Sequence, residues 1–92
     1  MSEPKQITLP IIHTNGTAAS DLLQGYMDAM EAVDDAIVAM RKIEFNARDY
    51  YCSPDPQAWT KAVAEQRDRY QALETVRQEL ETIAGHVSDF VK

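Results

Sequence analysis

The sequence predicts an all-α protein, a long antiparallel helical hairpin with a short extended N-terminal arm that assembles into a homo-oligomeric helical bundle. Two long stretches repeat apolar residues in alternating steps of three and four, which is the spacing of packed helices. A connection rich in turn-forming residues separates them. The predicted organisation is an arm and turn over residues 1–16 and a hairpin over 17–92, with helices over about 18–45 and 56–90.

The length of the chain and its single cysteine indicate why copies should associate. A domain of 92 residues buries only roughly 60–65% of the surface that its unfolded chain exposes. Cys52 alone forms no internal disulfide, and no Cys/His pairs have the spacing of zinc ligands. Self-association is the remaining way to stabilise so small a fold.

The N-terminal arm is expected to be extended and to end in a turn. Pro4 and Pro10 disfavour helix, and the apolar residues around them read as extended chain. Asn15 and Gly16 form a turn dipeptide. Thr17 follows as the expected N-cap of the first helix.

The first helix carries two apolar rows. The seam row comprises Leu23, Tyr26, Met30, Val33, Ile37 and Met40. The second row, one residue out of phase, comprises Leu22, Gly25, Ala29, Ala32, Ala36, Ala39 and Ile43. The rows lie about 100° apart around the helix, so one neighbouring helix covers only one of them. Because the second row is nearly all small residues, it predicts close packing by a helix of another copy.

The connection and the second helix follow from turn and capping residues. Asp55 is the expected cap of the second helix, with Pro56 at the first helical position, and Gly85 is expected to end or loosen its last turns. The predicted seam of this helix comprises Trp59, Val63, Gln66, Tyr70, Leu73, Val76, Leu80, Ile83, Val87 and Phe90.

Charge, hydropathy and motifs argue against several functions. A formal net charge of −6 opposes binding to duplex nucleic acid, although a few arginines and a helix N-terminus can still hold one small anion. No apolar stretch approaches the ~20 residues that cross a bilayer. Cys52, His13 and His86 lack partners for nucleophilic catalysis, and the acids of the first helix lack the histidines of a carboxylate metal site. We therefore expect no enzyme, metal, cofactor or membrane partner, and a cytoplasmic location.

Two segments, with three residues of the second helix, are the candidate ligand-binding residues. The turn supplies His13, Asn15, Gly16 and Thr17; the connection supplies Arg48, Tyr50 and Tyr51; the second helix supplies Gln66, Arg67 and Tyr70. A glycine turn before a helix N-terminus forms a nest for an anion, and arginine with tyrosine grips a phosphate and stacks on a base. Alternatively, the turn only caps the helix, the tyrosines plug the core, Arg48 pairs with Asp49 or a helix C-terminus, and Gln66 fixes helix register.

The patterns His-x-Asn-Gly-Thr before a helix and Asn-x-Arg-Asp-Tyr-Tyr between two helices resemble those of a group of small proteins encoded by tailed phages and prophages. The resemblance spans about Leu9 to Ile83 and rests on His13, Asn15, Gly16, Thr17, Asn46, Arg48, Asp49, Tyr50 and Tyr51. It implies a phage-derived protein that works in the host bacterial cytoplasm or in a virion, and it implies no particular activity.

Two functions remain as expectations. One is a non-enzymatic homo-oligomer that sequesters a small anionic, nucleotide-type ligand and so counters host defence signalling. The other is a structural or adaptor protein whose helical faces bind a virion or host protein. For the first, we expect a composite site: turn and connection lie ~40 Å apart in one hairpin, but an antiparallel dimer brings one copy's turn beside its partner's connection.

Overall fold

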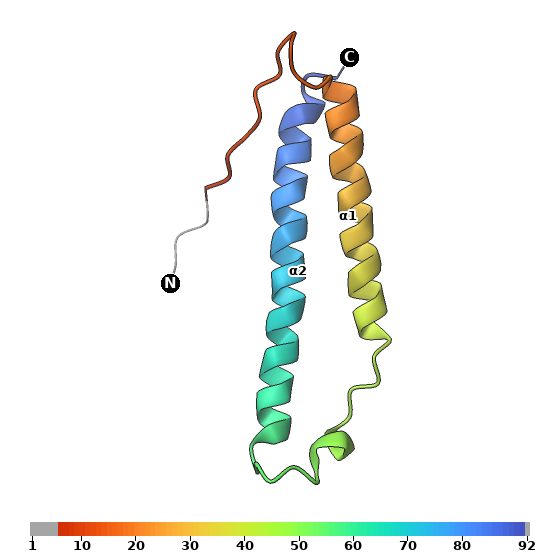
Figure 1. The fold of residues 1–92 in the computed structure, drawn as a ribbon, viewed down its shortest axis with the longest axis vertical. Coiled ribbons are helices and arrows are strands. Elements are labelled where there is room, and N and C mark those ends of the chain that lie inside the picture. Colours follow the sequence, from red (N-terminus) through yellow and green to blue (C-terminus); the bar gives the residue numbers. More distant parts are fainter. Residues whose placement is uncertain (1–5, 92) are drawn as a thin grey trace.

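The structure, a computed structural model that describes residues 6–91, is a helical hairpin. Its elements are α1 (Ala19–Arg41), the short 3-10 helix η1 (Ala47–Tyr50) and α2 (Ala58–Ser88). The two long helices lie side by side and antiparallel, and η1 closes the hairpin at one end (Figure 1). The described residues contain no strand. The prediction of an all-α hairpin is confirmed for the single chain.

Helix α1 ends four residues earlier than the predicted boundary at Phe45. Its last turn tightens, with the amide of Lys42 donating to the carbonyl of Ala39 and that of Ile43 to Met40. On a continued helix, Phe45 would point about 100° away from the seam. Leaving the helix lets this ring pack 4.9 Å from the ring of Trp59, so an aromatic contact determines where α1 stops.

Helix α2 begins two residues after its predicted start, so Pro56 lies before the helix, and Gln57 rather than the predicted Asp55 is the N-cap residue, with no side-chain cap. Asp55 nevertheless makes contacts at this end of α2. Its carboxylate accepts hydrogen bonds from the Gln57 amide at 2.9 Å and from Lys61 Nζ at 2.7 Å. Hydrogen bonds from Lys61 and Gln57 lower the pKa of the Asp55 carboxyl. At the other end, α2 continues through Gly85 to Ser88, so this glycine does not end the helix.

The α1 seam is as predicted, because each of its six residues is buried or half-buried. The α2 seam differs at several positions. Val63, Val76 and Phe90 are exposed, whereas Ala62 and Ala84 are buried and Arg77 is half-buried. The other seven predicted seam residues are buried or half-buried, so the predicted face of α2 is the one that packs against α1. The prediction missed the two buried alanines beside this seam.

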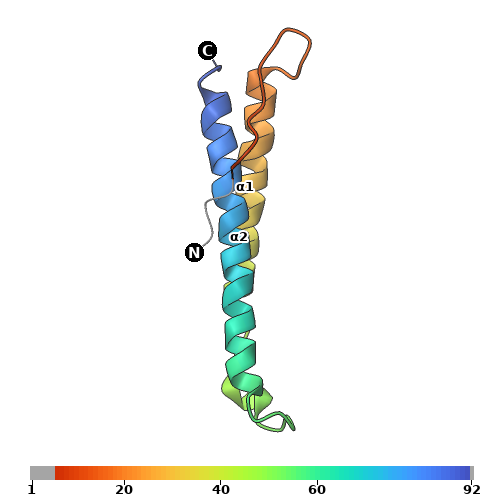
Figure 2. The ribbon, with the colours of Figure 1, turned by 90° about the vertical axis from the view of Figure 1, so that its left-hand side faces the viewer.

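The hairpin is long and thin. Its principal extents are 61 × 30 × 17 Å, and Figure 2 shows it edge-on with the two helices overlapping. Ile37, Ala62, Ala84 and Val87 are the buried apolar residues of the described chain. The second row of α1 is mostly exposed: Gly25, Ala32, Ala36, Ala39 and Ile43 all face solvent. Helix α2 thus covers the seam row of α1 and leaves the second row exposed, as expected for two rows about 100° apart around the helix.

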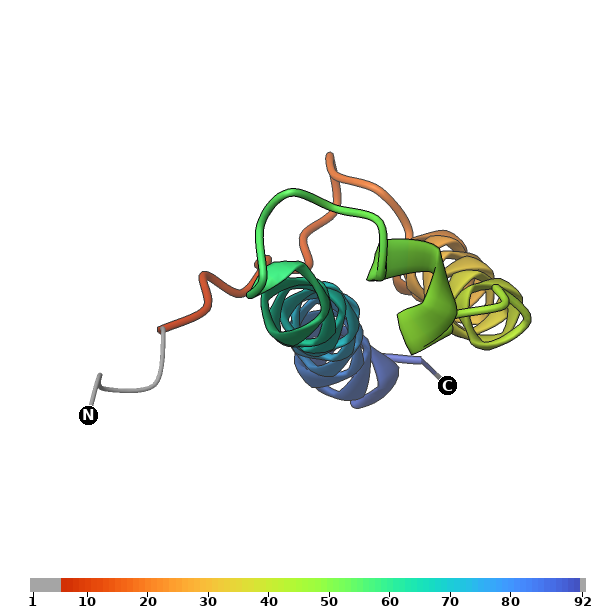
Figure 3. The same cartoon turned by 90° about the horizontal axis from the view of Figure 1, so that it is seen from below.

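The N-terminal segment, as far as it is described, runs back beside α2 on the side away from α1 (Figures 1 and 3). Residues 6–13 form neither helix nor strand, and a turn follows at 14–16. His86 Nε2 lies 2.9 Å from the carbonyl oxygen of Pro10, which ties the segment to α2. No helix of the described chain is long and apolar enough to cross a bilayer.

Candidate ligand-binding site

The two candidate segments lie at opposite ends of the hairpin. The turn containing His13, Asn15 and Gly16 precedes α1 at one end, and η1 with Arg48 lies at the other (Figure 1). The molecule is 61 Å long, so the turn and η1 of one chain do not form a common site. The structure thus agrees with the expectation that the segments cannot meet within one copy.

The turn is held by a close contact between His13 and Gly16. The Gly16 amide donates to the His13 carbonyl oxygen at 3.1 Å. A β-carbon on residue 16 would lie 2.9 Å from Nε2 of His13. The backbone of Gly16 adopts no left-handed conformation, so its φ angle does not require glycine. Asn15 and Thr17 beside it are exposed.

The N-terminus of α1 has no side-chain cap. Ala18 occupies the N-cap position, which corrects the prediction that Thr17 caps the helix. An additional residue between the turn and the helix leaves the Thr17 hydroxyl one position too early to cap. The amides of the first helical turn have no intrahelical acceptor, and no side chain caps them, so they can take an anion.

At the opposite end, three aromatic rings close the hairpin. Tyr50 lies 5.9 Å from Phe45 and 5.6 Å from Trp59, measured between ring centroids. Tyr50 is therefore part of a small aromatic core, which favours the plug interpretation for this tyrosine. Tyr51 is different, because it is 75% exposed. Its ring is open to stacking by a ligand.

Arg48 is exposed beside this aromatic core. Neither Asp49 nor any other acidic residue among residues 6–91 forms an ion pair with it. The alternative in which Arg48 pairs within the chain is thus absent from the described structure. With Tyr51 on the same short segment, Arg48 presents a cation and an aromatic face to solvent.

The three candidates on α2 differ in environment. Gln66 is half-buried, and its Oε1 accepts a hydrogen bond from Arg69 at 3.0 Å. Tyr70 is half-buried, whereas Arg67 is exposed and forms no ion pair with a described residue. Among the candidate residues, Arg67 is therefore the second accessible guanidinium after Arg48.

A mainly apolar groove of about 290 Å³ begins at the N-terminus of α1. It is lined by Thr17, Asp21, Leu22, Gly25, Tyr26, Ala29 and Leu80. Of these, only Thr17 is among the candidate residues, so sequence reasoning missed the groove as a site. The signal was present in the second row of α1, because Leu22, Gly25 and Ala29 belong to it.

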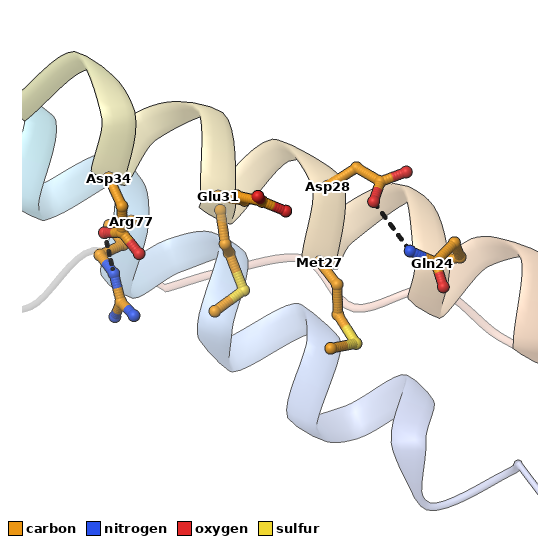
Figure 4. A pocket seen from close by; sticks show the side chains of 7 residues that line it. Gln24, Met27, Asp28, Glu31, Asp34 and Arg77 are labelled. Carbon is orange, nitrogen blue, oxygen red and sulfur yellow. Dashed lines mark hydrogen bonds and ion pairs between the residues drawn. The ribbon is translucent and has the colours of Figure 1, made fainter.

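A second groove, of about 300 Å³, lies on the other flank of the hairpin and is acidic (Figure 4). Asp28, Glu31 and Asp34 line it together with Arg77. The Arg77 guanidinium is already used, because it donates to Asp34 at 2.6 Å and to Glu81 at 2.9 Å. Asp34, more than Glu81, raises the pKa of Arg77. This groove repels anions and offers them no free cation.

Other chemistry finds no support in the described residues. No group of three histidine, cysteine or acidic side chains is placed to hold a metal ion within residues 6–91. Cys52 is an exposed free thiol.

No protein-family model matches the chain, and no curated protein or solved structure shows significant similarity to it.

Proposed function

We propose that the chain is a non-enzymatic binding protein of phage origin that sequesters a small anionic, nucleotide-type ligand. It acts in the host bacterial cytoplasm and withholds a nucleotide signal from a host defence system. Its main support is the unengaged state of Arg48 and Tyr51, since a charged and an aromatic side chain are exposed together without a partner among residues 6–91.

The connection end supplies the strong contacts. A guanidinium binds a phosphate through two parallel, charge-assisted hydrogen bonds. A tyrosine ring stacks on a nucleobase of any identity, and such stacking is worth about 1–3 kcal/mol per base. Arg48 offers the first contact and Tyr51 the second. Arg67 is the additional cation on α2, with Gln66 and Tyr70 beside it.

The turn end supplies neutral donors. The uncapped amides at the start of α1 and the exposed Thr17 hydroxyl accommodate a phosphate or a ribose. His13 keeps the turn narrow by packing against Gly16, and Asn15 lies exposed between them. The N-terminal segment acts as an extended arm, which the His86 contact to Pro10 anchors on α2.

The completed site requires two copies of the chain. One copy contributes the turn and its partner contributes the connection, twice in an antiparallel homo-oligomer. The net charge of −6 then serves selectivity, because a phosphate reaches only the local cationic sites while long polyanions are repelled.

The test is a thermal-shift screen of the purified protein against cyclic and linear nucleotides, followed by calorimetry on any hit. A ligand at one hundred times its dissociation constant stabilises the fold by about 2.7 kcal/mol. Arg48→Ala should abolish the shift and leave the unliganded melting temperature unchanged. Arg41→Ala, an exposed arginine outside the candidate set, is the matched control. A panel with no shift, or an unchanged shift in Arg48→Ala, counts against the proposal.

The second candidate function is an adaptor that binds a virion or host protein. Exposed large apolar residues favour it, because Ile11, Met27 and Val38 are 84%, 53% and 48% exposed. Stoichiometric recovery of one virion or host protein, together with a negative nucleotide screen, would make this function the better one.

A further inference from the structure

One face of α1 is apolar and uncovered in the described hairpin. This small face comprises Leu22, Gly25, Ala29, Ala32, Ala36, Ala39 and Ile43. All of these except Leu22 and Ala29 are exposed. Leu80 of α2 lines the same groove as Gly25 and Ala29, and Val76, 46% exposed, lies about 40° from Leu80 around α2. The apolar surface therefore continues from α1 onto α2.

The exposed area is larger than a single compact chain of this mass presents. The surface is 7308 Å², about 1,900 Å² more than the roughly 5,400 Å² expected for a folded monomer of 10.4 kDa. The radius of gyration is 18.8 Å, against about 12 Å for a compact domain of this length. Stable interfaces bury about 800 Å² on each partner, and obligate dimers bury more. The excess is what an obligate interface covers.

Gly25 points to close approach by another backbone. A β-carbon there would meet no atom within 4 Å, so nothing in the hairpin itself requires glycine. Alanine at an exposed helical position favours the helix over glycine. A glycine retained among alanines is typical of helices whose axes approach closely.

The small face is self-complementary when it is reversed. Its members are spaced by alternating steps of three and four, and large residues stand at its two ends with small ones between. Reversal about a point next to Ala32 sets Leu22 opposite Ile43 and Ala29 opposite Ala36. A two-fold axis brings a surface onto itself in this way.

From these observations we propose that a second copy of this chain covers the small face, α1 against α1 and antiparallel, with a two-fold axis near Ala32. The interface stands independently of any ligand. Its consequence for the binding site rests on the proposed function. In this register the start of α1 in one copy faces the connection of the other, so Thr17 lies towards the partner's Arg48 segment, twice per dimer.

Disulfide trapping tests the axis. In a chain with Cys52→Ser, the Ala32→Cys variant should form a disulfide-linked dimer under mild oxidation, because residues on a two-fold axis meet their own copies. The matched control is Val38→Cys, which is exposed about 120° from Ala32 around α1 and should remain unlinked. Linkage through residue 38 and not 32 would overturn the geometry.

Sedimentation equilibrium tests the interface without a new thiol. The chain should be at least dimeric at micromolar concentration, and Ala32→Arg should raise the dissociation constant at least tenfold, whereas Val38→Arg, on the other side of α1, should not. Gly25→Ala distinguishes a small face exposed to solvent from one packed against a second copy. If the face is free, the substitution raises the melting temperature; if the face is packed, the substitution weakens association. A stable monomer, or Gly25→Ala that raises the melting temperature without weakening association, overturns the proposal. Nucleotide binding by a monomer would refute this interface and the two-copy site but leave ligand sequestration itself standing, and a dimer without nucleotide binding would refute the proposed function alone.

Discussion

Arg77 Nε lies 2.6 Å from Asp34 Oδ1, which joins the two helices by an ion pair in the middle of the hairpin. The same guanidinium reaches Glu81 on its own helix at 2.9 Å. Val76, the residue before Arg77, was predicted in the seam and is 46% exposed. The Arg77 guanidinium therefore bridges α1 and α2 where the apolar seam of α2 is interrupted.

Removing this ion pair should reduce stability in a salt-dependent manner. Arg77→Ala is expected to lower the melting temperature, because it removes both hydrogen bonds and the packing of the aliphatic stem. Arg77→Met should lower it less, since it retains the stem. The partners are about one-third to one-half exposed, so 1 M salt should narrow the difference between wild type and Arg77→Met. A double-mutant cycle with Asp34→Asn measures the coupling, and additive effects would show that the pair contributes nothing.

The Asp55 carboxylate should make the start of α2 sensitive to acid. Hydrogen bonds from Lys61 and the Gln57 amide lower its pKa in the folded state. The folded protein therefore favours the ionised form, and this stabilisation is complete above the unfolded pKa of about 3.9. It is lost as the pH falls from there through the lower folded value. Asp55→Asn should thus destabilise the protein at pH 7 and have little effect near pH 2.

Thermal unfolding of wild type and Asp55→Asn across this range measures the effect. Asp35→Asn, on an exposed carboxylate that makes no ion pair among residues 6–91, is the control. A difference between wild type and Asp55→Asn that stays constant from pH 7 to pH 2 would contradict the assignment.

The sequence was sufficient to predict the hairpin because its helices are long and strongly periodic. Their ends were harder, since α1 stops where Phe45 turns towards Trp59, a contact between residues far apart in the chain. The seam of α2 was predicted correctly at seven of its ten positions, whereas Val63, Val76 and Phe90 are exposed. The buried alanines at 62 and 84 were missed, because alanine adds little to a hydrophobic pattern.

Some features of the candidate site were also predictable from the sequence and others were not. The position of Tyr50 and Tyr51 between a turn and a helix predicted that at least one of them would keep solvent access, and the structure shows that Tyr51 does. The absence of a side-chain cap on α1 did not follow, because Thr17 and Ala18 differ by one position and backbone angles decide between them. The spacing of small residues on α1 predicted an uncovered face, but which molecule covers that face depends on the free energy of association, which the pattern does not contain.

The adjacent tyrosines should separate stability from binding. Tyr50→Ala removes one of three packed rings and should destabilise the fold by about 2–3 kcal/mol, less than the ~3–5 kcal/mol of buried aromatic truncations because this ring is half-buried. Tyr51→Ala should change stability by less than about 0.5 kcal/mol, since its side chain is largely exposed. If Tyr51 stacks on a base, the same change should weaken nucleotide binding by roughly tenfold or more. Denaturant unfolding measures the stability of both variants, and calorimetry measures their nucleotide binding. Equal losses of binding in the two variants would contradict the assignment of a structural role to Tyr50 and a binding role to Tyr51.

Subunit mixing should reveal whether the binding site is shared between copies. Thr17→Glu and Arg48→Glu each place a carboxylate where we expect the ligand anion, and both positions are exposed, so folding should be unaffected. Either variant alone should bind no nucleotide. In a mixed dimer, one composite site carries both changes and the other carries neither. Equal mixing by co-refolding should therefore restore about a quarter of the wild-type sites, because half of the dimers are mixed and each has one intact site. A site built within one chain predicts no recovery of binding. A mixture of Arg41→Glu with Thr17→Glu is the control for the added negative charge, because every copy in that mixture keeps a wild-type connection.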